Sequence, residues 1–366
     1  MYKPGNHIHL MRYSWIMMGL LLLLACEEVI DLPAREVGGQ WVVSGLLSNS
    51  DQGNEVKVFR TAAYGQPAEP ISSAMVRVIA SSGEVFSLRP GAPGHYEFDP
   101  GFRGTVGESY RLEVELAGEL MATDFQTMMP LVGKDSLYYN VTVEETISSG
   151  VLIQEDVVQI LASTTFDTLP EEFYLRWEIS EIWTYLGTYV PPDYQIQCYV
   201  YRDLNRQSIF LHDGSENRAL SIPNIQYASR HIDRSFLGKH YFNLVKFNIS
   251  EEAHEYWQRL DQIVNLQGSL FDPAPAAVPG NVSSDTGEEI LGFFEVASVD
   301  TARMLMTNND IPLFLFDPCA MRGDQFLELL SYGRCFECMI DAGLVPAHCI
   351  RCGILEGSGA PRPGYF

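Results

Sequence analysis

The residues with the clearest chemical potential are the seven cysteines, because thiols form disulfides, bind metals or act as redox groups. Near the C-terminus they form two Cys-x-x-Cys pairs, Cys335/Cys338 and Cys349/Cys352. Four thiolates satisfy a tetrahedral zinc ion, and the neighbouring His348 is an alternative ligand. A redox site of the thioredoxin kind needs a pair that opens a helix after a strand, and neither pair has that context.

The N-terminus bears on the choice between these chemistries. After two basic residues, an apolar run extends from Trp15 to Ala25. It is too short to cross a hydrocarbon core, which takes roughly 20 residues, and it fits the apolar region of a secretory signal over residues 1–25. A small residue directly before Cys26 is the arrangement of a bacterial lipobox. We therefore expect Cys26 to be the lipidated first residue of the mature chain; an ordinary signal peptide with an incidental cysteine is the alternative.

Export changes the expected state of the thiols, because cysteines outside the cytoplasm are usually oxidised. Setting Cys26 aside leaves an even number, so we predict structural disulfides and keep zinc and a redox role as alternatives. The spacing does not determine the pairing. The predicted disulfide cysteines are Cys198, Cys319, Cys335, Cys338, Cys349 and Cys352.

The charge balance restricts the partners. The chain has 366 residues, with 24 basic and 47 acidic side chains and a formal net charge of −23. Binding to phosphates needs a basic surface, so we exclude nucleic acid as a partner. The same excess of acid disfavours electrostatic attraction to anionic lipid, but an acyl chain on Cys26 would hold the protein at a membrane without it.

A search for catalytic motifs finds none. No Gly-x-Ser-x-Gly nucleophile elbow is present, and His254-Glu255 lacks the second histidine of a zinc protease motif. We therefore expect no catalytic residue, no metal and no cofactor. A hydrolase whose site is assembled from dispersed acids is the least favoured alternative, because such a pairing is not visible in a sequence.

The pattern of apolar residues predicts a mainly β fold. Short segments such as Val56–Arg60 and Tyr110–Leu116 alternate apolar and polar residues, as half-buried strands do. We expect a tether at 26–39, an N-terminal antiparallel β-sandwich of the Ig-like or transthyretin-like kind at 40–130, and a larger β-rich domain at 134–318. A Cys-rich C-terminal tail follows at 319–366.

One amphipathic helix is expected within the larger domain, at 250–266. Ser250 is a good N-cap, and two glutamates follow it at the positive end of the helix dipole. Four aromatic residues in the larger domain could provide a stacking platform for a sugar or a peptide, although packing in a sheet core is the favoured interpretation. These candidate ligand-binding residues are Trp177, Trp183, Tyr185 and Tyr189.

Several segments together resemble a known family. The mature start is Cys-Glu-Glu-Val-Ile-Asp-Leu, the first strand reads Trp-Val-Val-Ser-Gly, and the chain ends Pro-Gly-Tyr-Phe. Between them lie Gly268–Pro273, Gly280–Val282 and Leu291–Phe294. In order and spacing these segments resemble the Bacteroidetes lipoproteins known as domain of unknown function 4249, over essentially the whole mature chain.

The resemblance implies a location and a kind of partner. Members of this family are exported lipoproteins, often encoded beside a TonB-dependent outer-membrane receptor, and no catalytic residues are attached to the family. We therefore expect a non-enzymatic outer-membrane lipoprotein, on the periplasmic or the cell-surface face, that serves such a receptor as an accessory or ligand-binding partner in nutrient uptake. A structural or adhesive surface protein without a transport role is the alternative.

Overall fold

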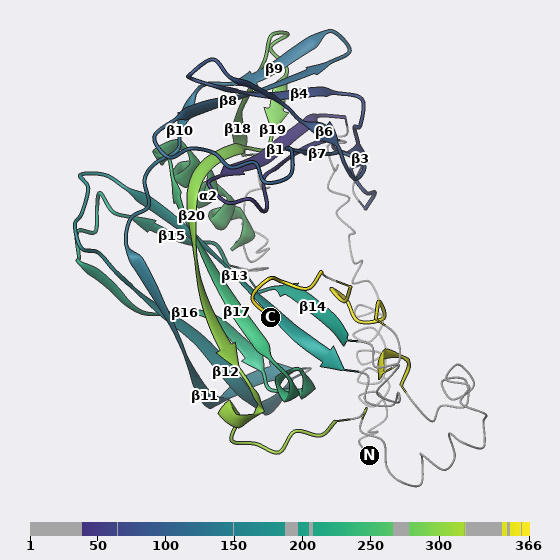
Figure 1. The fold of residues 1–366 in the computed structure, drawn as a ribbon, viewed down its shortest axis with the longest axis vertical. Coiled ribbons are helices and arrows are strands. Elements are labelled where there is room, and N and C mark those ends of the chain that lie inside the picture. Colours follow the sequence, from purple (N-terminus) through teal and green to yellow (C-terminus); the bar gives the residue numbers. More distant parts are fainter. Residues whose placement is uncertain are drawn as a thin grey trace, which may run out of the picture.

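The fold is described from a computed structural model, and it is mainly β, as the sequence predicts (Figure 1). One α-helix, α2 (Glu251–Val264), interrupts the strands. In the described part of the chain, no helix is long and apolar enough to span a membrane. The structure describes residues 39–63, 65–148, 150–186, 197–204, 208–265, 278–317, 319, 346–349, 352–359 and 361–366.

The N-terminal β-unit encloses one apolar core. Alternation places Val56 and Val58 of one strand, and Val76 and Val78 of another, in this core, while the residues between them are less buried. The unit begins with ten strands: β1 (Trp41–Ser48), β2 (Glu55–Arg60), β3 (Glu69–Pro70), β4 (Met75–Ala80), β5 (Val85–Ser87), β6 (Arg89–Pro90), β7 (His95–Glu97), β8 (Ser109–Leu116), β9 (Glu119–Thr123) and β10 (Gln126–Thr127).

Three later segments complete this unit. Strand β18 (Pro279–Ser284) pairs with β9, and β19 (Glu289–Leu291) pairs in parallel with β1. The first residues of β20 (Phe294–Met306) also run parallel to β1. All three lie within the range 134–318 that the sequence assigns to the larger domain, yet their hydrogen bonds join them to N-terminal strands. Strand pairing depends on which edges meet in space, and chain order does not reveal this.

The second β-unit consists of two sheets that face each other. One sheet has the order β14 or β15, then β13, β17 and the second part of β20. The other has the order β11–β12–β16. Besides β20, the two sheets of this unit contain seven strands: β11 (Lys134–Ser148), β12 (Val151–Thr165), β13 (Tyr174–Leu186), β14 (Gln197–Asp203), β15 (Phe210–Asp213), β16 (Ser221–His231) and β17 (His240–Ile249).

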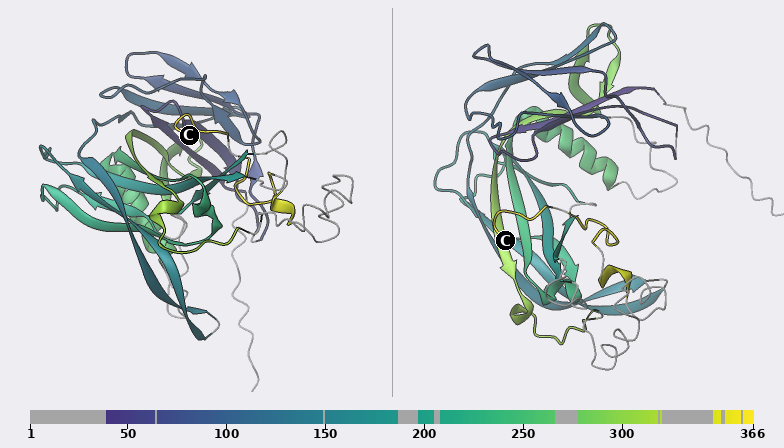
Figure 2. Two further views of the ribbon diagram at one scale, coloured as in Figure 1. Left: turned by 60° about the horizontal axis from the view of Figure 1, so that its bottom comes forward. Right: turned by 45° about the vertical axis from the view of Figure 1, so that its right-hand side comes forward.

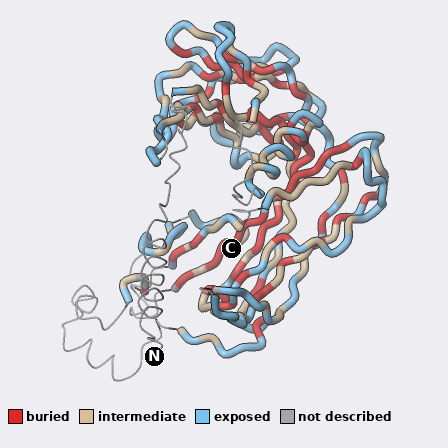
Figure 3. The backbone as a smooth tube through the Cα atoms, turned by 180° about the vertical axis from the view of Figure 1, so that it is seen from behind, coloured by how far each residue is buried: buried red, intermediate tan, exposed pale blue. Residues whose placement is uncertain are grey.

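Strand β20 connects the two units, because its first part pairs with β1 and its second part pairs with β17. Figure 2 shows the resulting curved molecule from two further directions, with α2 between the N-terminal unit and the long sheet. Buried residues follow the strands of both units in Figure 3. Three short 3-10 helices complete the described elements: η2 (Arg234–Leu237), η3 (Asn308–Asp310) and η4 (Ala347–Cys349).

The C-terminal segment is fixed to the edge of β14. The amide nitrogen of Tyr201 donates to the carbonyl of Gly357 at 3.0 Å, and Gly359 donates to Tyr199 at 3.2 Å. A disulfide joins Cys198 to Cys352 beside these bonds. The segment therefore continues the sheet past β14, and its attachment there is both covalent and hydrogen-bonded.

Candidate functional site

The candidate site is built around α2, which packs where the two β-units meet. Ser250 caps the helix, since its hydroxyl accepts a hydrogen bond from the amide of Ala253 at 3.2 Å. Tyr256 stacks on Phe293, which precedes β20, with ring centres 4.8 Å apart. The apolar face of the helix therefore packs toward the junction and fixes the position of its N-terminus.

A buried ion pair reinforces this junction. Arg176 on β13 reaches Glu295 on β20 at 2.8 Å, and it also pairs with Glu178. Its guanidinium lies 4.1 Å from the ring centre of Phe247 and 4.3 Å from that of Trp257. Burial alone would lower the pKa of Arg176, but the two carboxylates outweigh it and raise that pKa. The arginine stays charged, and its charge is balanced by Glu178 and Glu295 of the same protein.

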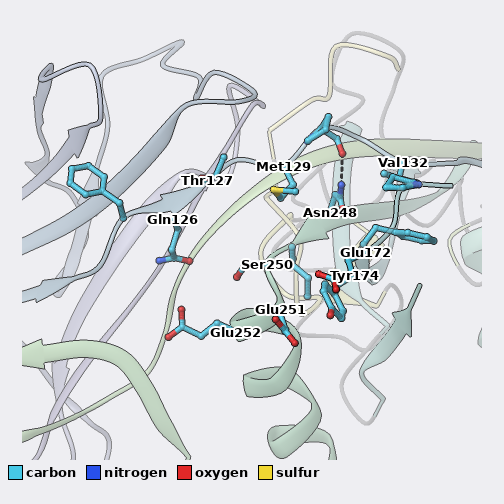
Figure 4. A pocket seen from close by; sticks show the side chains of 15 residues that line it. Gln126, Thr127, Met129, Val132, Glu172, Tyr174, Asn248, Ser250, Glu251 and Glu252 are labelled. Carbon is cyan, nitrogen blue, oxygen red and sulfur yellow. Dashed lines mark hydrogen bonds between the residues drawn. The ribbon is translucent and has the colours of Figure 1, made fainter. Parts of the chain in front are cut away.

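Beside the start of α2 lies a cavity of about 360 Å³, here called the junction cavity (Figure 4). It opens between β10, the segment after it, the start of β13 and the end of β17. Its walls are mostly apolar, which is typical of sites for small molecules. It is lined by Phe125, Gln126, Thr127, Met129, Pro130, Val132, Pro170, Glu172, Phe173, Tyr174, Asn248, Ile249, Ser250, Glu251 and Glu252.

Two amide side chains in this wall are buried and only half-satisfied. Asn248 is 2% exposed and donates to the carbonyl of Pro130. Gln126 is 6% exposed and donates to the carbonyl of Phe294 at 2.9 Å. Each amide oxygen has no hydrogen-bond partner among the residues that the structure describes. An unpaired buried acceptor costs about 1–3 kcal/mol, and both oxygens are enclosed by protein atoms.

The charged residues of the cavity wall are acidic. Glu172, Glu251 and Glu252 line it, and no lysine, arginine or histidine is among its described lining residues. Burial raises the pKa of Glu252, and the charges of Asp124 and Glu255 raise it further. The cavity therefore combines mostly apolar walls with three acidic residues.

Two further hollows of about 300 Å³ each are lined by Trp257. Both are lined by Arg176 and Glu178, which already form the junction ion pair. Their main charged groups are thus occupied within the protein. The junction cavity is the better candidate because its walls are mostly apolar and its glutamates are not part of that ion pair.

The aromatic residues named as a possible stacking platform, for which packing in a sheet core is the favoured interpretation, do not line the junction cavity. Trp177, Trp183 and Tyr185 are all buried on β13, on the face toward the β11–β12–β16 sheet, and Tyr189 falls outside the described residues. Trp177 belongs to the apolar core of the second unit. At these three positions the rings pack in the protein interior and offer no open face to a ligand.

The cysteines that the structure describes form two disulfides. Cys198 is bonded to Cys352, and Cys319 to Cys349. The two thiols of one Cys-x-x-Cys pair thus have different distant partners, so Cys349 and Cys352 do not act together as zinc ligands. Among the described residues, no group of three or more His, Cys, Asp or Glu is placed to hold a metal. The predicted sites at Cys26, Cys335 and Cys338 lie outside the described residues.

The second unit also contains a buried acid–histidine pair, and such pairs can transfer protons. Glu181 lies 2.9 Å from His240 and 2.9 Å from Arg230, and Glu181 and His240 are fully buried. Burial alone would raise the pKa of Glu181, but His240 and Arg230 lower it. A substrate has no access to these groups, so the arrangement is structural.

Sequence reasoning noted Ser250 and the two glutamates after it only as helix-starting residues. It gave no sign of Gln126 or Asn248. Gln126 bonds to a residue 168 positions away, and Asn248 bonds to one 118 positions away. Their role depends on long-range packing, for which the local pattern carries no signal.

Comparison with known proteins identifies a family and no characterised relative. No curated protein and no solved structure matches the chain. A family model described as Domain of unknown function (DUF4249) matches residues 27–303. This range includes the N-terminal unit, α2 and the junction cavity. The chain therefore belongs to the DUF4249 family, a domain of unknown function.

Proposed function

We propose that this protein is a lipid-anchored, non-enzymatic binding protein of the outer membrane, which takes a small ligand into the junction cavity and serves a TonB-dependent receptor in nutrient uptake. The observation that carries the binding role is the cavity itself. It offers about 360 Å³ of mostly apolar space lined by a few polar side chains, among them Gln126 and Asn248, and this is the composition of a ligand site.

The cavity supports binding over catalysis. The hydroxyl of Ser250 is engaged as the helix cap, and the other ionisable or hydroxyl-bearing residues of the lining are Thr127, Tyr174 and three glutamates. Among the described lining residues there is no histidine, lysine or cysteine to act as a base or a nucleophile. Ligand capture needs only shape and hydrogen bonds, and the cavity provides both.

The anchored location is supported by the N-terminal sequence. An apolar run ending in Ala25 precedes Cys26, and Glu27 and Glu28 follow. Acyl chains on Cys26 would hold the body at the membrane, on its periplasmic or cell-surface face, without a spanning helix. The same segment resembles lipoproteins that are encoded beside TonB-dependent receptors.

The test is purification of the tagged, full-length chain from native membranes in mild detergent, followed by mass spectrometry. We expect a TonB-dependent receptor to co-purify in near-equal amount. The matched control is Cys26→Ala, which should leave the membrane fraction and lose the receptor. If the wild-type chain is in the membrane and no receptor accompanies it, the transport role is wrong.

A second candidate function is adhesion at the cell surface, and the β11–β12 hairpin favours it. The described residues near its tip expose apolar side chains, with Ile147 75% and Leu152 59% exposed. Exposed apolar groups of this kind often mark contact surfaces. A double substitution Ile147→Ser/Leu152→Ser should abolish cell attachment if the protein is an adhesin, and should leave receptor co-purification unchanged.

A further inference from the structure

The two hollows that Trp257 lines adjoin one another, because Arg176 and Glu178 also line both of them. Neither hollow shares a lining residue with the junction cavity. We propose that together they form a groove, here called the Trp257 groove, that binds a neutral oligosaccharide. The groove is thus a second site, beyond the function proposed above.

The Trp257 groove lies where α2 meets strands of both units, and Figure 2 shows α2 in that position. Strand β1 in its wall pairs with β2 on one side and β20 on the other, and β13 pairs with β15 and β17. Extended peptides often bind by adding to a free strand edge, and these two strands present none here within the described structure. A ligand of the groove is therefore held by side chains, which is all that a sugar requires.

Several polar side chains of the groove are open to solvent. The side chains of Glu178 and Lys57 are 52% and 41% exposed, and Asp203 and Ser208 are also exposed. Carboxylates accept hydrogen bonds, an ammonium donates them, and a hydroxyl does both. Each hydroxyl of a sugar can likewise donate one hydrogen bond and accept others, so this mixed set of accessible groups suits a ring that carries several hydroxyls.

Each charged side chain that lines the groove already has a partner in the protein. The pairs are Lys57–Glu55 at 2.7 Å, Arg176–Glu178, Arg176–Glu295 at 2.8 Å, and the Tyr201 hydroxyl with Asp203 at 2.6 Å. A charged ligand would have to displace these partners, and a charge deprived of its partner is costly. A neutral ligand can use the remaining lone pairs of the carboxylates and leave the pairs in place.

Trp257 supplies an aromatic surface that both hollows share. Its indole nitrogen donates to the carboxylate of Glu295, and the guanidinium of Arg176 lies 4.3 Å from its ring centre. These contacts fix the position of the ring, which stays partly exposed. Tyr201 is 44% exposed and adds a second ring beside Asp203. The C–H bonds of a sugar ring can pack on such aromatic surface while its hydroxyls reach the polar groups around it.

The test is binding of the full-length protein, in detergent, to a printed array of short oligosaccharides that includes neutral, acidic and amino sugars. We expect the neutral sugars to give the strongest signals. Calorimetric titration with the strongest neutral glycan then measures its affinity, and N-acetyl-trialanine-amide is the neutral peptide probe. We expect the glycan to bind about tenfold more tightly than this peptide, because its hydroxyls add hydrogen bonds to charged groups.

Three variants locate the site. Asp203→Ala and Lys57→Ala each remove an accessible polar group, one from each hollow, and each should weaken glycan binding about tenfold. Trp257→Ala removes the shared ring and should weaken binding at least as much. The controls are Asp167→Ala, which removes an exposed carboxylate outside both hollows, and Phe125→Ala, which removes an exposed ring from the junction cavity. Both controls should bind the glycan as the wild type does.

Absence of binding to every neutral glycan would overturn the proposal, and so would tighter binding of the peptide or of charged glycans. Unchanged affinity in Asp203→Ala and Lys57→Ala would also overturn it, and this outcome does not depend on whether Trp257→Ala folds. A loss of affinity in Phe125→Ala would place the glycan in the junction cavity and contradict the groove. If the glycan binds and no receptor co-purifies, the groove stands and the transport role is wrong; if the receptor co-purifies without glycan binding, the reverse holds.

Discussion

The two β-units are held together by different kinds of core. The core of the N-terminal unit consists of apolar side chains such as Val78 and Leu112. The second unit also has an apolar core, but it buries charged groups between its sheets as well. Glu181 lies there with Arg230, and the fully buried Lys246 donates to the carbonyl of Gly133 at 2.6 Å and lies 3.5 Å from Asp135.

This difference predicts different vulnerabilities. An apolar core loses stability in proportion to the volume removed from it, whatever the pH. A buried ion pair adds little net stability when complete, but it becomes a large liability when one partner is removed. The contrast can be tested by single substitutions in each unit and by varying pH.

The largest effect is expected for Arg230→Ala. It removes the guanidinium that holds Glu181 at 2.9 Å and leaves a fully buried carboxylate with fewer partners. Breaking a buried pair in this way costs about 3–5 kcal/mol. Urea unfolding at pH 7, followed by circular dichroism, measures the loss. The double substitution Arg230→Met/Glu181→Leu is the control and should recover most of the stability.

The pH dependence of Arg230→Ala identifies charge as the cause. His240 and Arg230 lower the pKa of Glu181 in the folded state against the effect of burial. Glu181 therefore contributes stability above the ordinary glutamate pKa of about 4.3, and this contribution is lost as the pH falls through the lowered folded value. The defect of the variant should shrink as Glu181 becomes protonated. An equal defect at pH 4 and pH 7 would mean that lost packing, and not charge, is responsible.

In the N-terminal unit, the corresponding substitution is Leu112→Ala. Leu112 is fully buried in the centre of β8, so its truncation should cost about 2–5 kcal/mol in unfolding free energy. The loss should be the same at pH 4 and pH 7. The exposed Val85→Ala serves as control and should stay within about 0.5 kcal/mol of wild type. A strong pH dependence for Leu112→Ala would remove the distinction between the two cores.

The two disulfides among the described residues sharpen the comparison, because both connect parts of the second unit and its C-terminal segment. The double substitution Cys198→Ser/Cys352→Ser should cost about 2–4 kcal/mol and release the segment from the edge of β14. Limited proteolysis should then cut the C-terminal segment first. Leu112→Ala is the control, since it should leave that segment resistant. Unchanged resistance in the cysteine variant would show that the hydrogen bonds of Tyr201 and Tyr199 suffice.

Much of the fold follows from local sequence. The alternation over Val56–Arg60 predicts β2, and the N-cap at Ser250 predicts a helix that the structure places at Glu251–Val264. Both signals are short-range, because side-chain direction and helix capping depend only on neighbouring residues. These elements are confirmed for that reason.

The candidate site has a different origin. Strands β18 and β19 lie late in the chain and pair with β9 and β1, so the boundary between the units cannot be read from chain order. Gln126 and Asn248 line one cavity only after the units have packed together. Their amides follow no motif, and an unpaired oxygen is recognised only when every neighbour is in place. Sequence reasoning therefore finds the elements and misses the site that they form.

The smallest effect is expected at the helix that lies between the two units. Ser250→Ala removes the hydrogen bond from Ala253 and should cost about 1 kcal/mol in unfolding free energy. Ser250→Asp keeps a capping oxygen and should unfold close to wild type, while it adds a negative charge to the wall of the junction cavity. The two variants thus separate the loss of the capping oxygen from the change of side chain. Urea unfolding followed by circular dichroism measures both. A loss for aspartate as large as that for alanine would mean that the hydrogen bond from Ala253 is not what stabilises the start of the helix.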